Sequence, residues 1–563
     1  MSQEIKIKLI CNGSAIYVGW RKSGANGSCV CYIVVAGLIQ TSKKFSFGSK
    51  TLWMWYLFIK PVLTSRNVIH RLSDNVRQRT LLRGSHLIGL FEMRRITIFL
   101  GLVFFAAYFF LCCYYWKERV LFTDTAYQLF KLVNLETFNV EAGRYSAVVT
   151  QLFTWAAVKA GAGLSVVAFV FSISFPLVFF AAYLVAVFAF RNAAAGLMII
   201  VTLCLGIRQS FFHPVTETHQ ALVYSILFFA WLYSAEPHHR FAYHTGVRLM
   251  VGLAILCLCW FSHPVAFPVI MFILLYYAID TKKPGSMAVF GSFILTAVAG
   301  VIKFLITPSA SYEGQFLSQV GRFPELILKY NSLYSVWFYR HLFLTVYWVP
   351  FLMVMVAAGV CICRRNYWKA GFLAACYFGF LLFTNLIYNT EDAQVMMERS
   401  YMPLALFAAV PFVHGIMQAG RKIRLLKLSL LVVMVIYSLA GIFKAGIFFN
   451  DRLQYMHMFF KHMDASQCKK LVVNWNNTSH GLIYVPWAFA VESLMYSSFT
   501  GKQHSKTVYI SMEDHEAETA RPELFLFVHF NPVSSINDLN GKYFSLPPQP
   551  YCRWNKPLLY SEE

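Results

Sequence analysis

Long apolar stretches recur along the chain between residues 96 and 449. Residues 96–114 and 166–190 are nearly free of charged side chains. A helix needs about 20 apolar residues to cross the roughly 30 Å hydrocarbon layer of a membrane. We therefore expect an all-α polytopic membrane bundle. About eleven spanning helices are predicted, at residues 96–116, 166–190, 193–207, 221–234, 249–261, 264–279, 287–306, 342–363, 370–388, 402–417 and 428–449.

The charged residues give this bundle a direction. Only 13% of the residues are charged, whereas soluble proteins carry about 25%. The net charge of +23 does not indicate a nucleic-acid partner, because Lys and Arg collect in the cytoplasmic loops of membrane proteins. A cytoplasmic start of helix 96–116 places most of the loop cations on the cytoplasmic side: Arg191, Arg240, Arg248, Lys282, Lys283, Arg364, Arg365, Lys369, Arg421, Lys422, Arg424 and Lys427.

Residues 1–92 differ from the rest of the chain. They contain 13 Lys or Arg and 3 Asp or Glu, with irregular apolar patches and no clear helical or strand period. Met93 is followed by two arginines and an apolar helix, as in membrane proteins whose N-terminus stays in the cytoplasm. We expect residues 1–92 to be translated leader sequence upstream of a natural start at Met93. The alternative is a poorly ordered basic cytoplasmic extension with a weak membrane segment at residues 52–63.

The residues after the last predicted span are more polar. This scheme places residues 450–563 outside the cytoplasm, together with the loops 117–145, 208–220, 307–341 and 389–401. Residues 470–473 and 524–529 are strand-like, which predicts a small α+β segment behind the membrane domain of residues 93–449. Cys468 and Cys552 can pair there if that compartment is oxidising.

Two of the outer loops carry candidate chemistry. Asp124 lies just beyond the first span, where it is either a functional carboxylate or the N-cap of a helix at residues 127–135. The loop 208–219 holds Arg208, His213, Glu217 and His219. Imidazole and carboxylate groups are suited to a divalent metal or to a phosphate. The alternative is a solvated loop in which Thr216 and Glu217 cap the next helix.

Further ionisable residues lie at the outer ends of helices. His263 follows a short helix and is placed near the membrane surface, where ionisable groups are usually functional. Positive-inside statistics disfavour cations on the outer side, yet five are found there: Arg144, Arg208, Lys303, Arg340 and Arg399. Together they can hold a phosphate. Alternatively, single members pair with acidic neighbours: Glu141, Glu391, Asp392 or Glu398.

The sequence Asp124-Thr-Ala-Tyr127 resembles the D-E-x-x-Y motif of the GT-C superfamily, although its second residue differs. Arg144, the acidic loop with Glu217 and the short helix pair around residues 252–268 are similar to later landmarks of that superfamily. The resemblance covers about residues 93–450. It implies a membrane glycosyltransferase that moves a hexosyl or pentosyl group from a polyprenyl-phosphate donor.

The resemblance also implies a role for each candidate residue. Asp124 would be the general base that activates an acceptor hydroxyl of a lipid, glycan or protein. Glu217 with His213 or His219 would position a divalent cation (Mg or Mn) or the acceptor. The departing lipid phosphate would be neutralised by four residues: Arg144, Arg208, His263 and Arg399.

Two other functions fit the same pattern. A transporter or flippase for lipid-linked saccharides would also use cations on the outer face, although transporters place polar groups at the midplane. A non-catalytic membrane assembly protein would not depend on Asp124 or Glu217. For all three functions we expect a multi-pass protein of the bacterial inner membrane, in the cell envelope, with a cytoplasmic N-terminus and an extracytoplasmic C-terminus.

Overall fold

The computed structural model describes the backbone of residues 4–11, 14–23, 28–35 and 84–554. Within the last range it leaves out 235–244, 282–286, 309–310, 312–313, 316–317, 390, 392–393, 484, 513–515 and 529–530. The weak segment 52–63 and Arg240, Lys282, Lys283 and Asp392 therefore lie outside the described residues. The chain divides into two compact units, Met1–Leu90 and Phe91–Glu563.

The first unit contains a three-stranded antiparallel sheet in the order β1-β2-β3. Its strands are β1 (Glu4–Cys11), β2 (Ser14–Ser23) and β3 (Ser28–Val35). The expectation that this part has no strand period was wrong. Isoleucine or leucine at positions 5, 7 and 9 alternates with lysine at 6 and 8, and such a two-residue period is typical of a strand.

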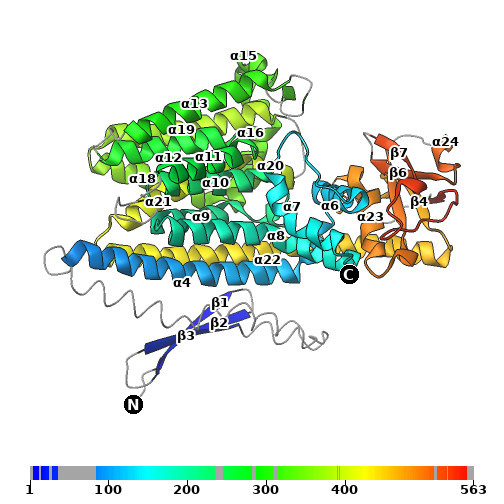
Figure 1. Cartoon of the computed structure of the whole chain (residues 1–563), viewed down its shortest axis with the longest axis horizontal. Helices are drawn as coiled ribbons and strands as arrows, with labels where there is room; N and C mark the ends of the chain where they lie inside the picture. Colours follow the sequence, from blue (N-terminus) through cyan, green and yellow to red (C-terminus); the bar gives the residue numbers. More distant parts are fainter. Residues whose placement is uncertain are drawn as a thin grey trace. The chain divides into compact units, whose positions relative to one another are not determined.

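The second unit is mostly helical, and each predicted span overlaps a helix (Figure 1). These helices are α4 (Gly84–Tyr114), α8 (Leu164–Leu184), α9 (Ala193–Gly206), α10 (Glu217–Leu232), α11 (Thr245–Trp260), α12 (Ala266–Thr281), α13 (Met287–Ile306), α18 (Trp348–Cys363), α19 (Tyr367–Ile387), α21 (Pro403–Met417) and α22 (Arg421–Ala465).

The count of eleven membrane-spanning helices is not supported. Six helices in the described part are long and apolar enough to cross a membrane, or seven if the pair Tyr334–Val346 and Trp348–Cys363, bent by 88°, forms one span. The other predicted spans, α9 to α12, are only 14 to 16 residues long. Nearly every side chain of α9 and α10 is buried inside the bundle. Their apolar sequence therefore reflects packing in the core, since a helix that is hydrophobic all round is a buried one.

Small residues let the helices approach closely. A Cβ atom added to Gly101 of α4 would lie 2.1 Å from the ring of Tyr183, and one added to Gly446 of α22 would lie 2.5 Å from the ring of Tyr115. The Tyr183 hydroxyl donates a hydrogen bond of 2.7 Å to the carbonyl of Thr97. Glycine at these positions therefore lets tyrosine rings fill the space between helices.

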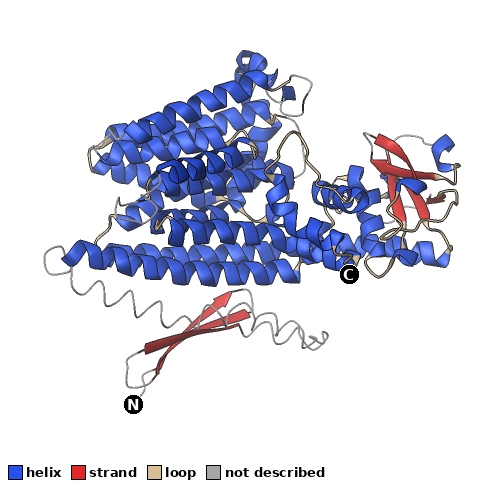
Figure 2. Ribbon diagram, in the orientation of Figure 1, coloured by secondary structure: helices blue, strands red, loops and turns tan. Residues whose placement is uncertain are grey.

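The C-terminal segment has the predicted mixed structure (Figure 2). Strands β4 (Lys470–Asn474), β5 (Thr507–Ser511) and β8 (Cys552–Trp554) form a parallel sheet in the order β5-β4-β8. Strands β6 (Leu524–Val528) and β7 (Asn531–Ser535) form an antiparallel pair. Helix α23 (Phe489–Ser498) packs on β5. A disulfide joins Cys468, just before β4, to Cys552 in β8.

The segment does not begin where the last span was expected to end. Helix α22 continues without a break past residue 449 to Ala465. Its final turns supply Tyr455, Phe459 and Met463 to a core that also contains Leu471 and Ile510. The C-terminal segment is therefore built onto the end of α22.

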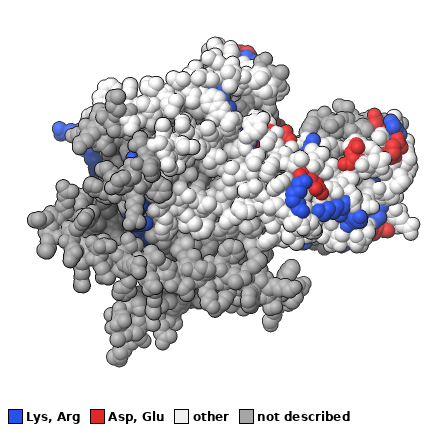
Figure 3. Space-filling view, in the orientation of Figure 1, with Lys and Arg blue, Asp and Glu red and all other residues white. Residues whose placement is uncertain are grey.

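A second core joins this segment to two helices that lie between α4 and α8 in the chain. Helix α6 (Thr123–Leu135) lies beside α23 at one end of the bundle (Figure 1), and Val158 of helix α7 (Ala147–Lys159) belongs to the same core. Phe130 of α6 packs on Phe525 and Phe544. Charged side chains are gathered on the C-terminal segment, whereas the visible face of the bundle is almost free of them (Figure 3).

Candidate functional site

Asp124 lies where two distant loops meet at the end of the bundle. It is the second residue of α6, whose N-cap is Phe122, so Asp124 is not the cap of a later helix. Its Oδ2 atom is 3.2 Å from His213 Nε2 and 3.3 Å from Arg399 Nη1. The sequence placed all three residues in outer loops, and the fold brings them into contact.

His213 is oriented by its own turn. Its Nδ1 atom lies 2.8 Å from the Thr216 hydroxyl, which is also 2.9 Å from the His213 carbonyl. If the hydroxyl donates to the carbonyl, Nδ1 is a donor; if it donates to Nδ1, the ring proton is on Nε2. The Nε2 atom lies 3.2 Å from Asp124 Oδ2 but does not meet the geometry of a hydrogen bond.

These two neighbours decide the charge of Asp124. Burial raises the pKa of its carboxyl, but the neighbouring His213 and Arg399 outweigh burial and lower the pKa from 3.8 to about 2. The Asp124 side chain is still 34% exposed, so solvent screens part of this effect. Asp124 is thus an ionised carboxylate that a molecule from solution can reach.

The residue before Arg399 fixes the loop that carries His213. The Glu398 carboxylate accepts hydrogen bonds from the backbone amides of Arg208, Gln209 and Ser210, at 2.9 to 3.2 Å, and from the Ser210 hydroxyl at 2.8 Å. Glu398 belongs to α20 (Gln394–Tyr401). It therefore joins α20 to the start of the 208–219 loop. In the described part of the chain, no ion pair joins Glu398 to an outer arginine side chain, which was the alternative.

Arg144 and Glu217 form a second pair in this region. Their closest atoms, Nη1 and Oε2, are 2.8 Å apart, and the side chains are only 11% and 7% exposed. Glu217 begins α10, and Thr216 makes no side-chain cap bond to that helix. Arg144 thus pairs with Glu217, which was not among the acidic residues expected to pair with it.

His263 lies in the connection between α11 and α12, close to the same cations. Burial lowers its pKa well below 6.5, and the charges of Arg144, Arg399 and Lys303 lower the pKa further. Its Nδ1 atom accepts a hydrogen bond from the Val265 amide at 3.2 Å. His263 is therefore a neutral imidazole surrounded by positive charge.

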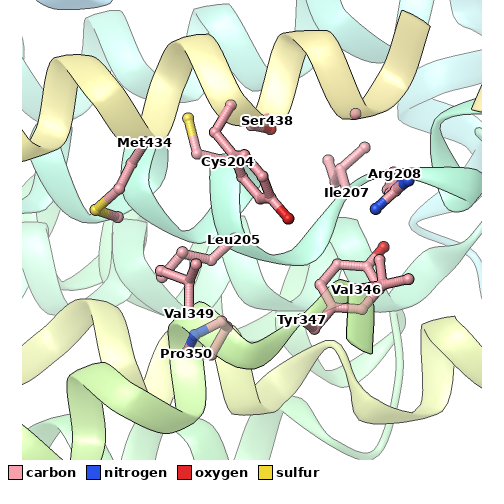
Figure 4. A pocket seen from close by; sticks show the side chains of 12 residues that line it. Cys204, Leu205, Ile207, Arg208, Val346, Tyr347, Val349, Pro350, Met434 and Ser438 are labelled. Carbon is pink, nitrogen blue, oxygen red and sulfur yellow. The ribbon is translucent and has the colours of Figure 1, made fainter. Parts of the chain in front are cut away.

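Two candidates do not join Asp124. Arg208 extends into a crevice between α9, α18 and α22, with Tyr347 at the same end and Met434 and Leu205 further along (Figure 4). His219 is buried on α10 beside the ring of Phe179, and its Nε2 atom has no hydrogen-bond partner among the described residues. Neither Arg208 nor His219 therefore contributes to the cluster around Asp124.

The expected metal ligands are not gathered around one point. In the part of the chain that the structure describes, no three or more His, Cys, Asp or Glu side chains form a group that could hold a metal ion. His213 faces Asp124, and Glu217 faces Arg144. A Mg or Mn ion stays a prediction.

The pattern of the sequence did not single out Glu492 and Arg452, which are both fully buried and form an ion pair next to the Asp124 turn. A signal was present in the sequence. Glu492 is the one charged residue of α23, whose other residues are apolar or small. A carboxylate on such a helix needs a buried partner.

No family model, curated protein or solved structure matches this chain.

Proposed function

We propose that this protein is a membrane glycosyltransferase that moves a sugar from a polyprenyl-phosphate donor to an acceptor hydroxyl. One observation carries the proposal. An ionised, partly exposed carboxylate, Asp124, lies within 3.3 Å of both Arg399 and His213 at one end of an apolar helix bundle. Such a site combines a proton acceptor with cations that can bind a phosphate.

In the proposed reaction the acceptor oxygen forms a bond to the anomeric carbon of the sugar. The bond between that carbon and the phosphate oxygen breaks, and the phosphate leaves with the electron pair. The acceptor proton passes to Asp124. The reaction therefore needs a carboxylate on one side of the sugar and positive charge on the other.

Arg399 connects these two requirements. A carboxylate whose pKa is about 2 is a weak base, because a general base works best with a pKa near the working pH. A donor phosphate would compete with Asp124 for Arg399. Once Arg399 turns toward the phosphate, the pKa of Asp124 rises and its basicity increases.

Arg144 and His263 would complete the phosphate side. Arg144 is held by Glu217, and neutral His263 lies close enough to Arg144 and Arg399 to feel their charges. A leaving phosphate would bind this positive region as its charge grows. Arg208 is not part of this group, because its guanidinium lies in a crevice with apolar walls (Figure 4).

We also propose that the site faces away from the cytoplasm of a bacterial inner membrane. The disulfide between Cys468 and Cys552 supports this orientation, because disulfides persist in oxidising compartments. The loop cations assigned to the cytoplasmic side in the sequence agree with it. The C-terminus would then be extracytoplasmic.

The test is sugar transfer in proteoliposomes that contain labelled polyprenyl-phosphate sugars. We expect transfer by the wild-type protein and a loss of about 100-fold or more in Asp124→Asn, since removing a general base typically costs 10²–10⁴-fold. Asp464→Asn is the control, because Asp464 also pairs with a cation, Lys506, but is 66% exposed. Full activity in Asp124→Asn would refute the base assignment. Movement of the lipid-linked sugar without transfer would indicate a flippase.

A further inference from the structure

A buried carboxylate of the C-terminal segment bonds to the Asp124 turn. Glu492 of α23 accepts a hydrogen bond of 2.7 Å from the backbone amide of Thr123, the residue just before Asp124. The other oxygen of Glu492 pairs with Arg452 of α22. Arg452 in turn donates a hydrogen bond of 2.9 Å to the carbonyl of Leu121. Arg452 thus holds the backbone at Leu121, and Glu492 holds it at Thr123.

These contacts are protected from solvent. Glu492 is 0% and Arg452 is 1% exposed. The guanidinium of Arg452 lies over the ring of Phe122 at 5.2 Å and over that of Phe489 at 5.5 Å. Hydrogen bonds to charged groups are stronger than neutral ones, and burial strengthens them further. The turn is therefore fixed by charged groups in an apolar setting.

The held backbone is strained. Thr123 has a φ of +40°, which is an outlier for a β-branched residue. Its hydroxyl is buried and has no hydrogen-bond partner among the described residues. Strained conformations persist only when the surroundings impose them, and they cluster at functional sites. Here the contacts that impose the conformation come from Glu492 and Arg452.

We infer that Glu492 is a positioning residue, which, with Arg452, holds the strained Thr123 turn so that Asp124 faces His213 and Arg399. This inference rests on the proposed function for its catalytic meaning. It gives the C-terminal segment a role in the membrane site, because α23 supplies the carboxylate that the turn needs. Without that carboxylate, the turn would relax and Asp124 would lose its alignment.

The decisive variant removes both charges. Changing Glu492 alone would leave Arg452 buried without its partner, which is strongly destabilising, whereas replacing a buried pair by apolar residues is often neutral. We therefore choose Arg452→Met with Glu492→Leu in one protein. In proteoliposomes we expect kcat for transfer to fall by about 10- to 100-fold, as for a small misplacement of a reacting group. KM for the donor should stay within about twofold, since the phosphate-binding cations are unchanged.

A third substitution separates positioning from general damage. Thr123→Gly, added to the double variant, should recover at least part of the lost kcat, because glycine adopts positive φ without strain. A merely structural role of the ion pair would give no such rescue. The control is Arg521→Gln with Glu523→Gln, which removes an exposed ion pair of the same segment and should leave kcat unchanged.

Hydrogen exchange of full-length protein in nanodiscs makes the test independent of the reaction. The peptide that contains Thr123 should exchange faster in the double variant than in the wild type, because its amide has lost the Glu492 acceptor. Unchanged exchange, or a folded double variant with wild-type kcat, would overturn the positioning role. If the wild type transfers no sugar at all, the proposed function fails, and the exchange result still decides the inference.

Discussion

Arg399 Nη1 lies 3.3 Å from Asp124 Oδ2, although 275 residues separate them in the chain. The Arg399 side chain is 20% exposed and the Asp124 side chain 34%, so both can be reached by a substrate. Arg399 follows Glu398, which is bonded to the loop of His213. One short helix, α20, thus arranges both neighbours of Asp124.

Arg399→Gln should shift the pH dependence of transfer. Without Arg399, the pKa of Asp124 rises from about 2 toward its ordinary value, by about one unit, as expected for loss of one nearby opposite charge. On acidification, Asp124 in the variant therefore becomes protonated at a higher pH than in the wild type. The pH profile of kcat/KM reports the pKa values of the free enzyme. Its acid limb should shift to higher pH by the same amount. Arg322→Gln, an exposed arginine on another helix, should leave the profile where it is, and an unshifted limb in Arg399→Gln would refute the coupling.

The sequence predicted which residues lie near helix ends but not which of them touch. Asp124, His213 and Arg399 were each placed in outer loops from the pattern of apolar runs and cations. Their contact depends on how α6, α20 and the 208–219 loop pack, and no local pattern encodes that packing. The pairing of Arg144 with Glu217 was not predicted for the same reason, since the two residues are 73 positions apart in the chain.

Lengths were harder to predict than positions. The apolar stretches that became α9 and α10 were interpreted as spans, although they form 14- and 16-residue helices inside the bundle. Apolar composition alone does not separate a lipid-facing helix from a buried one. The positive φ of Thr123 could not be predicted from the sequence either, because threonine rarely adopts positive φ.

Glu217→Gln should destabilise the protein. The change leaves Arg144 charged and mostly buried, and breaking a buried pair costs about 3–5 kcal/mol. Arg144→Met with Glu217→Leu should return the unfolding temperature close to that of the wild type, while transfer stays low because the phosphate side has lost a cation. Thermal unfolding followed by tryptophan fluorescence measures both variants. Equal unfolding temperatures for Glu217→Gln and the wild type would contradict the prediction.

The stability of the C-terminal segment should rise with pH in alkaline solution. Burial lowers the pKa of Lys470 from 10.5 to about 8, and its Nζ atom donates to the carbonyls of Pro522 and Leu524. Between pH 8 and 10.5 the unfolded state therefore binds more protons than the folded state, so stability increases with pH by on the order of 1–3 kcal/mol. Below pH 8 this contribution is constant. Lys470→Met should remove the alkaline increase in unfolding temperature, and an identical increase in that variant would refute the assignment.

The disulfide offers a test of both stability and orientation. Cys468 and Cys552 are 84 residues apart in the sequence, and closing a loop of that size typically stabilises a fold by about 2–5 kcal/mol. Cys552→Ser should lower the unfolding temperature of the C-terminal segment, whose helix α23 carries Glu492. Transfer should therefore become more sensitive to temperature in this variant, through loss of the Thr123 turn, while remaining near the wild-type rate in the cold.

In membranes treated with a thiol reagent before any reduction, Cys468 and Cys552 should stay unmodified and become labelled only after a reductant is added. Labelling of both without a reductant would contradict the disulfide and the outward orientation together, because thiols of a cytoplasmic segment are kept reduced.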